Sequence, residues 1–128
     1  MTLLLDTHLL IWATEDSPRL SAEAVALMRD PSNKVTLSVV NLWEIVIKQG
    51  LGRSDFAVDA RQLRTRVLKT GLNELTVTAE HALAVTTLPS HHKDPFDRLL
   101  VAQASVEGFT LLTSDPVVAK YPGRILKV

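Results

Sequence analysis

The chain has 128 residues, and its 14 basic and 14 acidic side chains balance to a formal net charge of zero. That balance argues against a polybasic nucleic-acid-coating protein, an acidic tail or a membrane-surface binder. Hydrophobic residues make up 46% of the chain and cysteine is absent, which predicts a globular core and excludes disulfides and thiolate metal sites. We expect one domain over residues 1–128, in the cytoplasm and without membrane attachment, because apolar runs are short and no signal peptide precedes Asp6.

The first half of the chain alternates short apolar runs with helical patterns. An apolar run stops abruptly at Asp6, Ser17-Pro18 marks a turn, and Ser21 is a suitable helix cap. Gly50-Leu51-Gly52 ends a further helix. The expected elements are strands at 2–5 and 35–38 and helices at 8–14, 21–29, from 38 to 49, and 59–70.

The second half repeats this alternation. Asp94-Pro95 combines a helix cap with proline at the first helical position, and Gly108 stops the helix that follows. Strands alternating with helices predict a parallel sheet covered by helices, an α/β fold. The expected elements are strands at 75–77, 109–113 and 124–128 and helices from 78 to before 89, at 96–107 and at 116–120.

Acidic residues stand where such a sheet would gather them. Asp6 and Asp115 follow two of the expected strands, and ligands of open parallel sheets bind beyond the carboxyl ends of strands. Glu44 and Asp97 lie on helices that should border the same crevice. Each acid also has an ordinary explanation, since Asp6 and Asp115 are suitable caps and Asp97 has the capping-box spacing from Asp94.

Glu44 lies in a helical segment, residues 42–47, that is apolar on nearly all sides and is therefore expected to be buried. A lone buried carboxylate is costly, so either Lys48 one turn later or a shared metal ion should meet it. Several close carboxylates are tolerated when a divalent cation neutralises them, and oxygen ligands select Mg²⁺ or Mn²⁺. Such sites commonly hydrolyse phosphodiesters. The adjacent His91 and His92 lack the spacing of a zinc site.

The sequence resembles the PIN-domain ribonucleases of the VapC-like type II toxin family. The Asp-Pro-Phe-Asp-Arg run at 94–98, followed by an apolar helix, is the most specific part of this likeness. The resemblance implies a three-layer α/β sandwich with a central, mainly parallel sheet, and a Mg²⁺- or Mn²⁺-dependent endoribonuclease. It rests on four segments in family order: Leu4–His8, Ser38–Ile45, His92–Ala104 and Leu111–Asp115.

The resemblance also assigns roles to the acids. The family's acidic quartet falls on Asp6, Glu44, Asp97 and Asp115, all of which are acids in this chain. We expect Asp6 and Asp97 to bind the metal directly, and the other two to complete the site directly or through water. Asp94 is expected to cap its helix and to support the site from outside.

Other polar residues have less specific expectations. Thr113 or Ser114 would hydrogen-bond an acid or the scissile phosphate, unless either only satisfies backbone at a strand end. Arg98 would contact substrate or a carboxylate. Arg61 and Arg64 share a side of the basic helix at 59–70 and could track an RNA backbone, although a solvated helix face explains them equally well.

The partners implied by the resemblance are an RNA substrate, a small antitoxin protein that blocks or distorts the acidic site, and a second copy in a homodimer. Trp12 and Trp43 are expected in the core rather than at such contacts. The alternative function is a non-catalytic PIN-like adaptor that binds RNA or protein, against which the intact acidic set argues. A receiver-like module or a phosphatase using Asp6 ranks lower, because Ser38 ends the second strand and His8 replaces a second aspartate.

Overall fold

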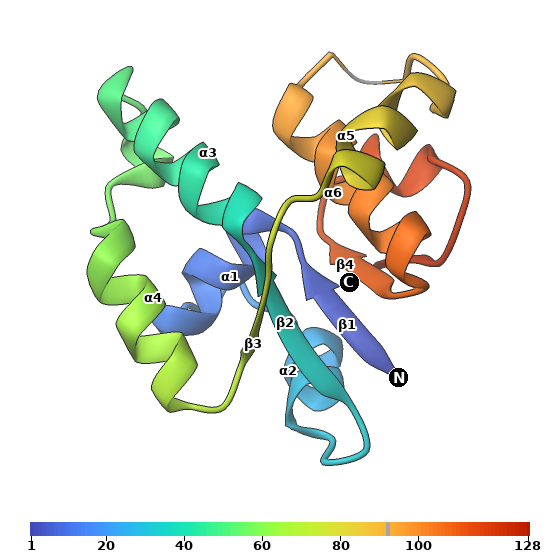
Figure 1. Cartoon of the computed structure of the whole chain (residues 1–128). Coiled ribbons are helices and arrows are strands. Elements are labelled where there is room, and N and C mark those ends of the chain that lie inside the picture. The colour runs from blue at the N-terminus through green and yellow to red at the C-terminus, as the bar shows by residue number, and fades with distance from the viewer. Residues whose placement is uncertain (92) are drawn as a thin grey trace.

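A central sheet of five parallel strands organises the molecule, whose computed structural model describes residues 1–91 and 93–128. The strand order is β3-β2-β1-β4-β5, so the direction of winding reverses between β1 and β4 (Figure 1). Every neighbouring pair is parallel, as the alternation of strands and helices predicts. The strands are β1 (Thr2–Leu5), β2 (Lys34–Ser38), β3 (Asn73–Leu75), β4 (Thr110–Thr113) and β5 (Ile125–Lys127).

Helices cover both faces of the sheet. On one face lie α1, α2 and α4, on the other lie α5 and α6, and α3 leaves the carboxyl end of β2 to contact both α1 and α6 (Figure 1). The expected three-layer α/β sandwich is confirmed. The helices are α1 (Thr7–Thr14), α2 (Ala22–Arg29), α3 (Val39–Gly50), α4 (Ala60–Lys69), α5 (Ala79–Ala84) and α6 (Pro95–Glu107), with short 3₁₀ turns at Ser54–Phe56, Val85–Thr87 and Val118–Lys120.

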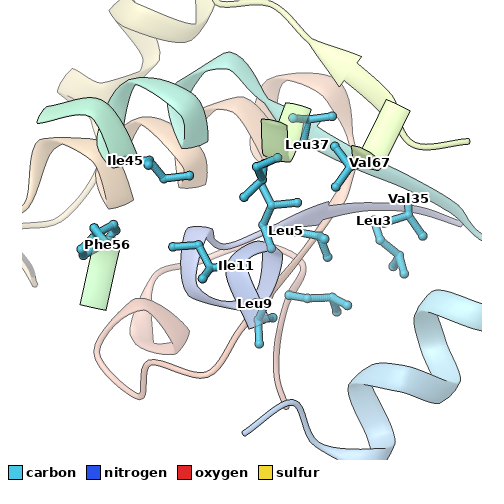
Figure 2. Packing of buried hydrophobic residues seen from close by; sticks show 12 residues of the cluster. Leu3, Leu5, Leu9, Ile11, Val35, Leu37, Ile45, Phe56 and Val67 are labelled. Carbon is cyan, nitrogen blue, oxygen red and sulfur yellow. The ribbon is translucent and has the colours of Figure 1, made fainter. Parts of the chain in front are cut away.

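The core divides into two apolar layers because side chains alternate along each strand. Leu3 and Leu5 of β1 pack toward α1 and α4, as Figure 2 shows, whereas Leu4 faces the layer built on α6. β1 is therefore buried on both faces, which explains its uninterrupted leucines. This central strand holds Asp6, the residue after it, at a fixed position beyond the sheet.

The structure corrects two expectations. β3 begins at Asn73 rather than Leu75, because Thr36 of β2 pairs with Asn73. α3 is not buried on nearly all sides, and Trp43, placed in the core by sequence, is exposed; Trp12 is partly buried against the core. We call the exposed residues of this region the apolar strip, and their exposed fractions are 50% for Trp43, 56% for Val46, 42% for Ile47 and 77% for Leu51.

Among the described residues, no helix combines the length and the apolar character needed to cross a lipid bilayer.

Candidate active site

The predicted acids lie around the carboxyl ends of β1 and β4, where the strand order reverses. In open α/β sheets this switch point leaves a crevice between helices that run to opposite faces. Asp6 follows β1 directly, and Thr113 ends β4. α3 and α6 contribute Glu44 and Asp97 from their buried sides.

Asp6 is buried and both of its carboxylate oxygens have donors. Oδ1 accepts from the backbone N–H of Thr7 at 2.6 Å, and Oδ2 accepts from the hydroxyl of Thr113 at 2.6 Å. Asp6 therefore caps α1 while it faces the crevice. Burial raises the pKa of Asp6, and the charge of Glu44 raises it further, while the bond from Thr113 opposes them.

Glu44 is buried, and a hydroxyl that is itself oriented by an amide holds one of its oxygens. Its Oε1 accepts from the hydroxyl of Thr7 at 2.5 Å. The amide nitrogen of Asn41 donates to that same hydroxyl at 2.9 Å and to the carbonyl of Leu5 at 3.1 Å. Because Asn41 occupies a lone pair of the Thr7 oxygen, the Thr7 hydrogen is left to point at Glu44.

Lys48 joins two of the acids. Its ammonium donates to Oε2 of Glu44 at 2.6 Å and to Oδ2 of Asp94 at 2.7 Å. Oδ1 of Asp94 accepts from the backbone of Phe96 and Asp97, as a cap of α6 should. Burial acts to raise the pKa of Asp94, but the bonds from Lys48 and the two amides set it below its usual value.

Asp97 is a strongly perturbed acid in this crevice. Burial and the negative charges of Asp6, Asp94 and Glu44 raise the pKa of Asp97 to about 8. Oxygens of Glu44, Asp94 and Asp97 lie within 4.8 Å of one another. We call Asp6, Glu44, Asp94 and Asp97 the acidic cluster.

Asp115 lies at the edge of this site. Its backbone N–H donates to the Thr113 hydroxyl at 3.0 Å, and its Oδ1 accepts from Val117 at 2.8 Å, so it caps the turn after β4. Thr113 thus connects Asp115 to Asp6. Ser114, between Thr113 and Asp115 in the sequence, is partly buried.

A second polar group, in which the buried His81 and Gln103 meet the exposed Glu107, adjoins the acidic cluster. His81 Nε2 lies 2.9 Å from Oε2 of Glu107, and His81 Nδ1 accepts from the backbone N–H of Thr78 at 3.0 Å. Because Nδ1 is an acceptor, the histidine carries its proton on Nε2 and donates to Glu107. Gln103 Nε2 lies 3.3 Å from the same Nδ1. We call His81, Gln103 and Glu107 the histidine cluster.

The two clusters are connected through the end of β2. The hydroxyl of Ser38 donates to Oε1 of Gln103 at 2.6 Å, and the backbone N–H of Ser38 donates to Asn41 at 2.7 Å. The chain of bonds then passes through Thr7 to Glu44. Among the described residues, every buried side-chain nitrogen or oxygen has a hydrogen-bond partner.

Two basic residues, Arg98 and Arg64, have other partners than those expected from the sequence. The guanidinium of Arg98 donates to the carbonyls of Val85 and Pro89 and to the hydroxyl of Tyr121, so it ties loops together rather than meeting a carboxylate in the described contacts. Arg64 forms a bidentate ion pair with Glu74, which ties α4 to β3.

Arg61 and His91 are the remaining residues of the sequence analysis whose positions the structure describes. Arg61 lines a shallow hollow on α4 together with Gln62, Thr65, Arg66 and Lys69. His91 packs edge-on to Tyr121 with ring centroids 5.2 Å apart. His92 lies outside the described residues.

Sequence reasoning gave no role to Thr7 or Asn41, although both hold Glu44. A hydroxyl directly after the strand-end Asp6 was the available signal for Thr7. Asn41 gave a weaker signal, because an asparagine three residues after Ser38 is equally a capping-box partner, and it does form that box.

The donor set matches a hard divalent cation. All groups of the acidic cluster offer carboxylate oxygens, the ligands that Mg²⁺ and Mn²⁺ prefer over softer metals. Burial and the charges of the neighbouring acids raise the pKa of Asp97, and a divalent ion at this place would offset both effects. The fold and the site together define a parallel α/β protein with an acidic centre at the switch point of its sheet.

Comparison with known families agrees with that class. The chain belongs to the PIN domain family, whose model matches residues 3–123. No protein with a curated description matches the sequence. Solved structures with the same fold include VapBC2 from Rickettsia felis bound to a promoter DNA fragment, with a TM-score of 0.71 and 16% identity over 99% of this chain and 98% of that chain.

Two further structures are similar over nearly their whole length. VapBC-1 from nontypeable Haemophilus influenzae has a TM-score of 0.65 and 17% identity, covering 99% of this chain and 98% of that chain. A toxin–antitoxin complex from Klebsiella pneumoniae has a TM-score of 0.62 and 21% identity, covering 98% and 96%. At these identities the likeness establishes the fold.

Proposed function

We propose that this protein is a metal-dependent endoribonuclease that hydrolyses RNA phosphodiester bonds and acts as the toxin of a toxin–antitoxin pair. The observation that carries the proposal is the acidic cluster, in which buried carboxylates meet at the switch point and the pKa of Asp97 rises to about 8. Repulsion between buried carboxylates destabilises the folded state unless a cation neutralises them. Acids with perturbed pKa values of this kind concentrate at functional sites.

In this proposal Asp6 and Asp97 hold the divalent ion, with Glu44 and Asp115 completing the site directly or through water. A bound Mg²⁺ or Mn²⁺ supplies an activated water and stabilises charge on the transferring phosphoryl group. Thr113 fixes one oxygen of Asp6, and Thr7 fixes one oxygen of Glu44. These hydroxyls keep the acids oriented before substrate arrives, which lowers the reorganisation needed during reaction.

RNA binding is assigned to the basic face of α4. Arg61, Arg66 and Lys69 surround one shallow hollow, and their charges suit a phosphate backbone. Arg64 supports this face indirectly, because its pairing with Glu74 anchors α4 to the sheet. The side chain of Arg64 remains half exposed.

The toxin role implies an antitoxin, and the apolar strip is the surface we assign to it. Trp43, Val46, Ile47 and Leu51 expose large apolar side chains along and just beyond α3, the helix that also carries Glu44. Contiguous exposed apolar residues typically mark protein contacts. The VapBC composition of the similar structures supports such a partner. We also propose a homodimer and a cytoplasmic location, where RNA is available.

The test is RNA cleavage by purified protein, freed of any bound partner, under Mg²⁺, Mn²⁺ or EDTA. We expect fragments from a labelled RNA pool only when a divalent ion is present. Asp97→Asn should reduce cleavage at least about 100-fold, because it removes one charge from the centre that stabilises the reacting phosphate. Glu23→Gln, an exposed acid on α2, serves as the matched control and should cleave like the unaltered protein.

Intact RNA in every arm, from folded protein that binds the ion, would favour the non-catalytic adaptor. Cleavage that persists in EDTA or in Asp97→Asn would remove the acidic cluster from the mechanism.

A further inference from the structure

Lys48 is the one cation that contacts the acidic cluster in the described part of the chain, and two elements hold it in place. Its ammonium lies 2.6 Å from Glu44 on its own helix and 2.7 Å from Asp94, 46 residues away at the start of α6. A pairing with Glu44 alone would be an ordinary helical ion pair. The bond to Asp94 makes Lys48 a bridge between α3 and α6.

Aromatic rings surround the same ammonium. Lys48 Nζ lies 5.0 Å from the ring centroid of Phe56 and 5.5 Å from that of Phe96. Both distances are within the range of cation–π attraction, which favours a positive charge at this position. The side chain of Lys48 is only 14% exposed. Two carboxylates and two rings therefore define a position built for a cation.

That position coincides with the tightest group of acids. Glu44, Asp94 and Asp97 offer oxygens within 4.8 Å of one another, a spacing suited to a metal ion. Lys48 already bonds one oxygen of Glu44 and one of Asp94, and the second oxygens of these two acids accept from Thr7 and from backbone amides. Among these donors Lys48 is the one that carries a positive charge, so it neutralises both acids at the position a second divalent ion would take.

We infer that Lys48 is a positioning residue that occupies the place of a second divalent cation, so that the site takes a single ion on its Asp6–Asp97 side. This inference rests on the proposed metal-dependent function. It gives Glu44 and Asp94 a supporting part, in which they orient Lys48 and repel a second anion. The lysine keeps their charge neutralised whether or not the divalent ion is bound.

The test counts bound Mn²⁺ per chain, using the electron paramagnetic resonance signal of unbound Mn²⁺ during a titration of the whole protein. We expect one ion for the unaltered chain and two for Lys48→Met, because the vacated carboxylates then accept an ion. Lys48→Gln, which keeps a donor without the charge, carries the same expectation should the methionine variant fail to fold. Lys48→Arg restores the charge and should return the count to one.

Lys34→Met is the matched control, since Lys34 is exposed at the opposite, amino end of the sheet, and its count should stay at one. Two ions on the unaltered chain would overturn the inference, as would Lys48→Met and Lys48→Gln that fold and bind one ion with unchanged affinity. An unaltered chain that binds no Mn²⁺ would instead overturn the proposed function. The counts of zero, one and two therefore separate the two conclusions.

Discussion

The acidic cluster and the histidine cluster both place buried polar side chains beside the same sheet, yet they balance donors and acceptors in opposite ways. In the histidine cluster, His81 donates to Glu107 and accepts from Thr78, so each ring nitrogen has a complementary partner. In the acidic cluster, the ammonium of Lys48 bonds Glu44 and Asp94, and Asp6 and Asp97 add two further carboxylates beside them. Complementary buried bonds stabilise a fold, whereas an excess of like charge costs stability.

Within one connected network, the histidine cluster therefore stabilises the fold, whereas the acidic cluster is the candidate site. Ser38 bonds to Gln103 of the histidine cluster, and Asn41 and Thr7 extend the chain of bonds to Glu44. At one end of the network donors and acceptors are matched, while at the other end burial and neighbouring carboxylates raise the pKa of Asp97. Substitutions at the two ends should therefore have opposite consequences, and three measurements test this, with a fourth on an exposed charge group outside the network.

The largest expected effect is on the pH dependence of stability without divalent ions. Folding raises the pKa of Asp97 from its usual 3.8 to about 8, so between these values the folded chain holds a proton that the unfolded chain has lost. The free energy of unfolding should fall as pH rises through this window, by about 1 kcal/mol per pH unit. Urea denaturation in EDTA measures it.

Saturating Mg²⁺ should flatten that slope, and so should Asp97→Asn, which cannot titrate. Stability in EDTA that stays level or increases between pH 4 and 8 would contradict the picture of a charge-strained site.

The next largest effect is on RNA cleavage, when the carboxylate of Asp6 is replaced by an amide that leaves folding intact. Asp6→Asn should reduce RNA cleavage about 100-fold or more, or about 3 kcal/mol in transition-state stabilisation. Its free energy of unfolding in EDTA should not decrease by a comparable amount, because burial already disfavours the charged form of Asp6. Parallel losses of cleavage and stability would mean that Asp6 acts mainly as a helix cap.

The opposite pattern is expected in the histidine cluster. His81→Leu removes the partner of Thr78 N–H and of Glu107, and should lower the free energy of unfolding by about 2 kcal/mol. The count of bound Mn²⁺ should not change. The control is His91→Leu at an exposed position beside Tyr121, which should stay within about 0.5 kcal/mol. Equal stabilities of the two variants would show that the cluster contributes nothing.

The smallest effect belongs to an exposed charge group. Asp55 lies 2.8 Å from Arg53 and 3.1 Å from His8, and the hydrogen bonds from Arg53 lower the pKa of Asp55 to about 2. Its contribution is present above its usual 3.8 and disappears as pH falls through about 2. Because solvent screens this pair, Asp55→Asn should cost less than about 1 kcal/mol, and added salt should shrink the difference further.

Much of this architecture follows from local sequence patterns. Apolar runs that stop at Asp6 and at Thr113 predict strand ends, and the carboxyl ends of parallel strands meet at one edge of a sheet. The Asp94-Pro95 cap and Gly108 delimit α6, since glycine accepts the left-handed backbone at its end, with a φ of 72°. A gathering of Asp6, Glu44 and Asp97 could thus be predicted, whereas Asp94 was expected only to cap α6 and support the site.

What escaped prediction depends on contacts between distant segments. Trp43 is exposed because it lies on a different face of α3 from the buried Glu44 and Ile45, and an apolar pattern does not reveal which face of a helix meets a neighbour. The sequence indicated no partner for Arg64, because Glu74 lies ten residues away and reaches it only through the position of β3. Asn41 and Thr7 lie 34 residues apart, so no local spacing could indicate that one orients the other toward Glu44.

The bond between Thr113 and Asp6 spans 107 residues, and it has a consequence for synthesis. β1 leaves the ribosome early, but one of its two neighbours in the sheet, β4, is translated near the opposite end of the chain. Such distant pairing delays folding until both segments are available. The acidic cluster therefore does not form while the chain is still being translated, and a chain cut short before β4 lacks the Thr113 that holds Asp6.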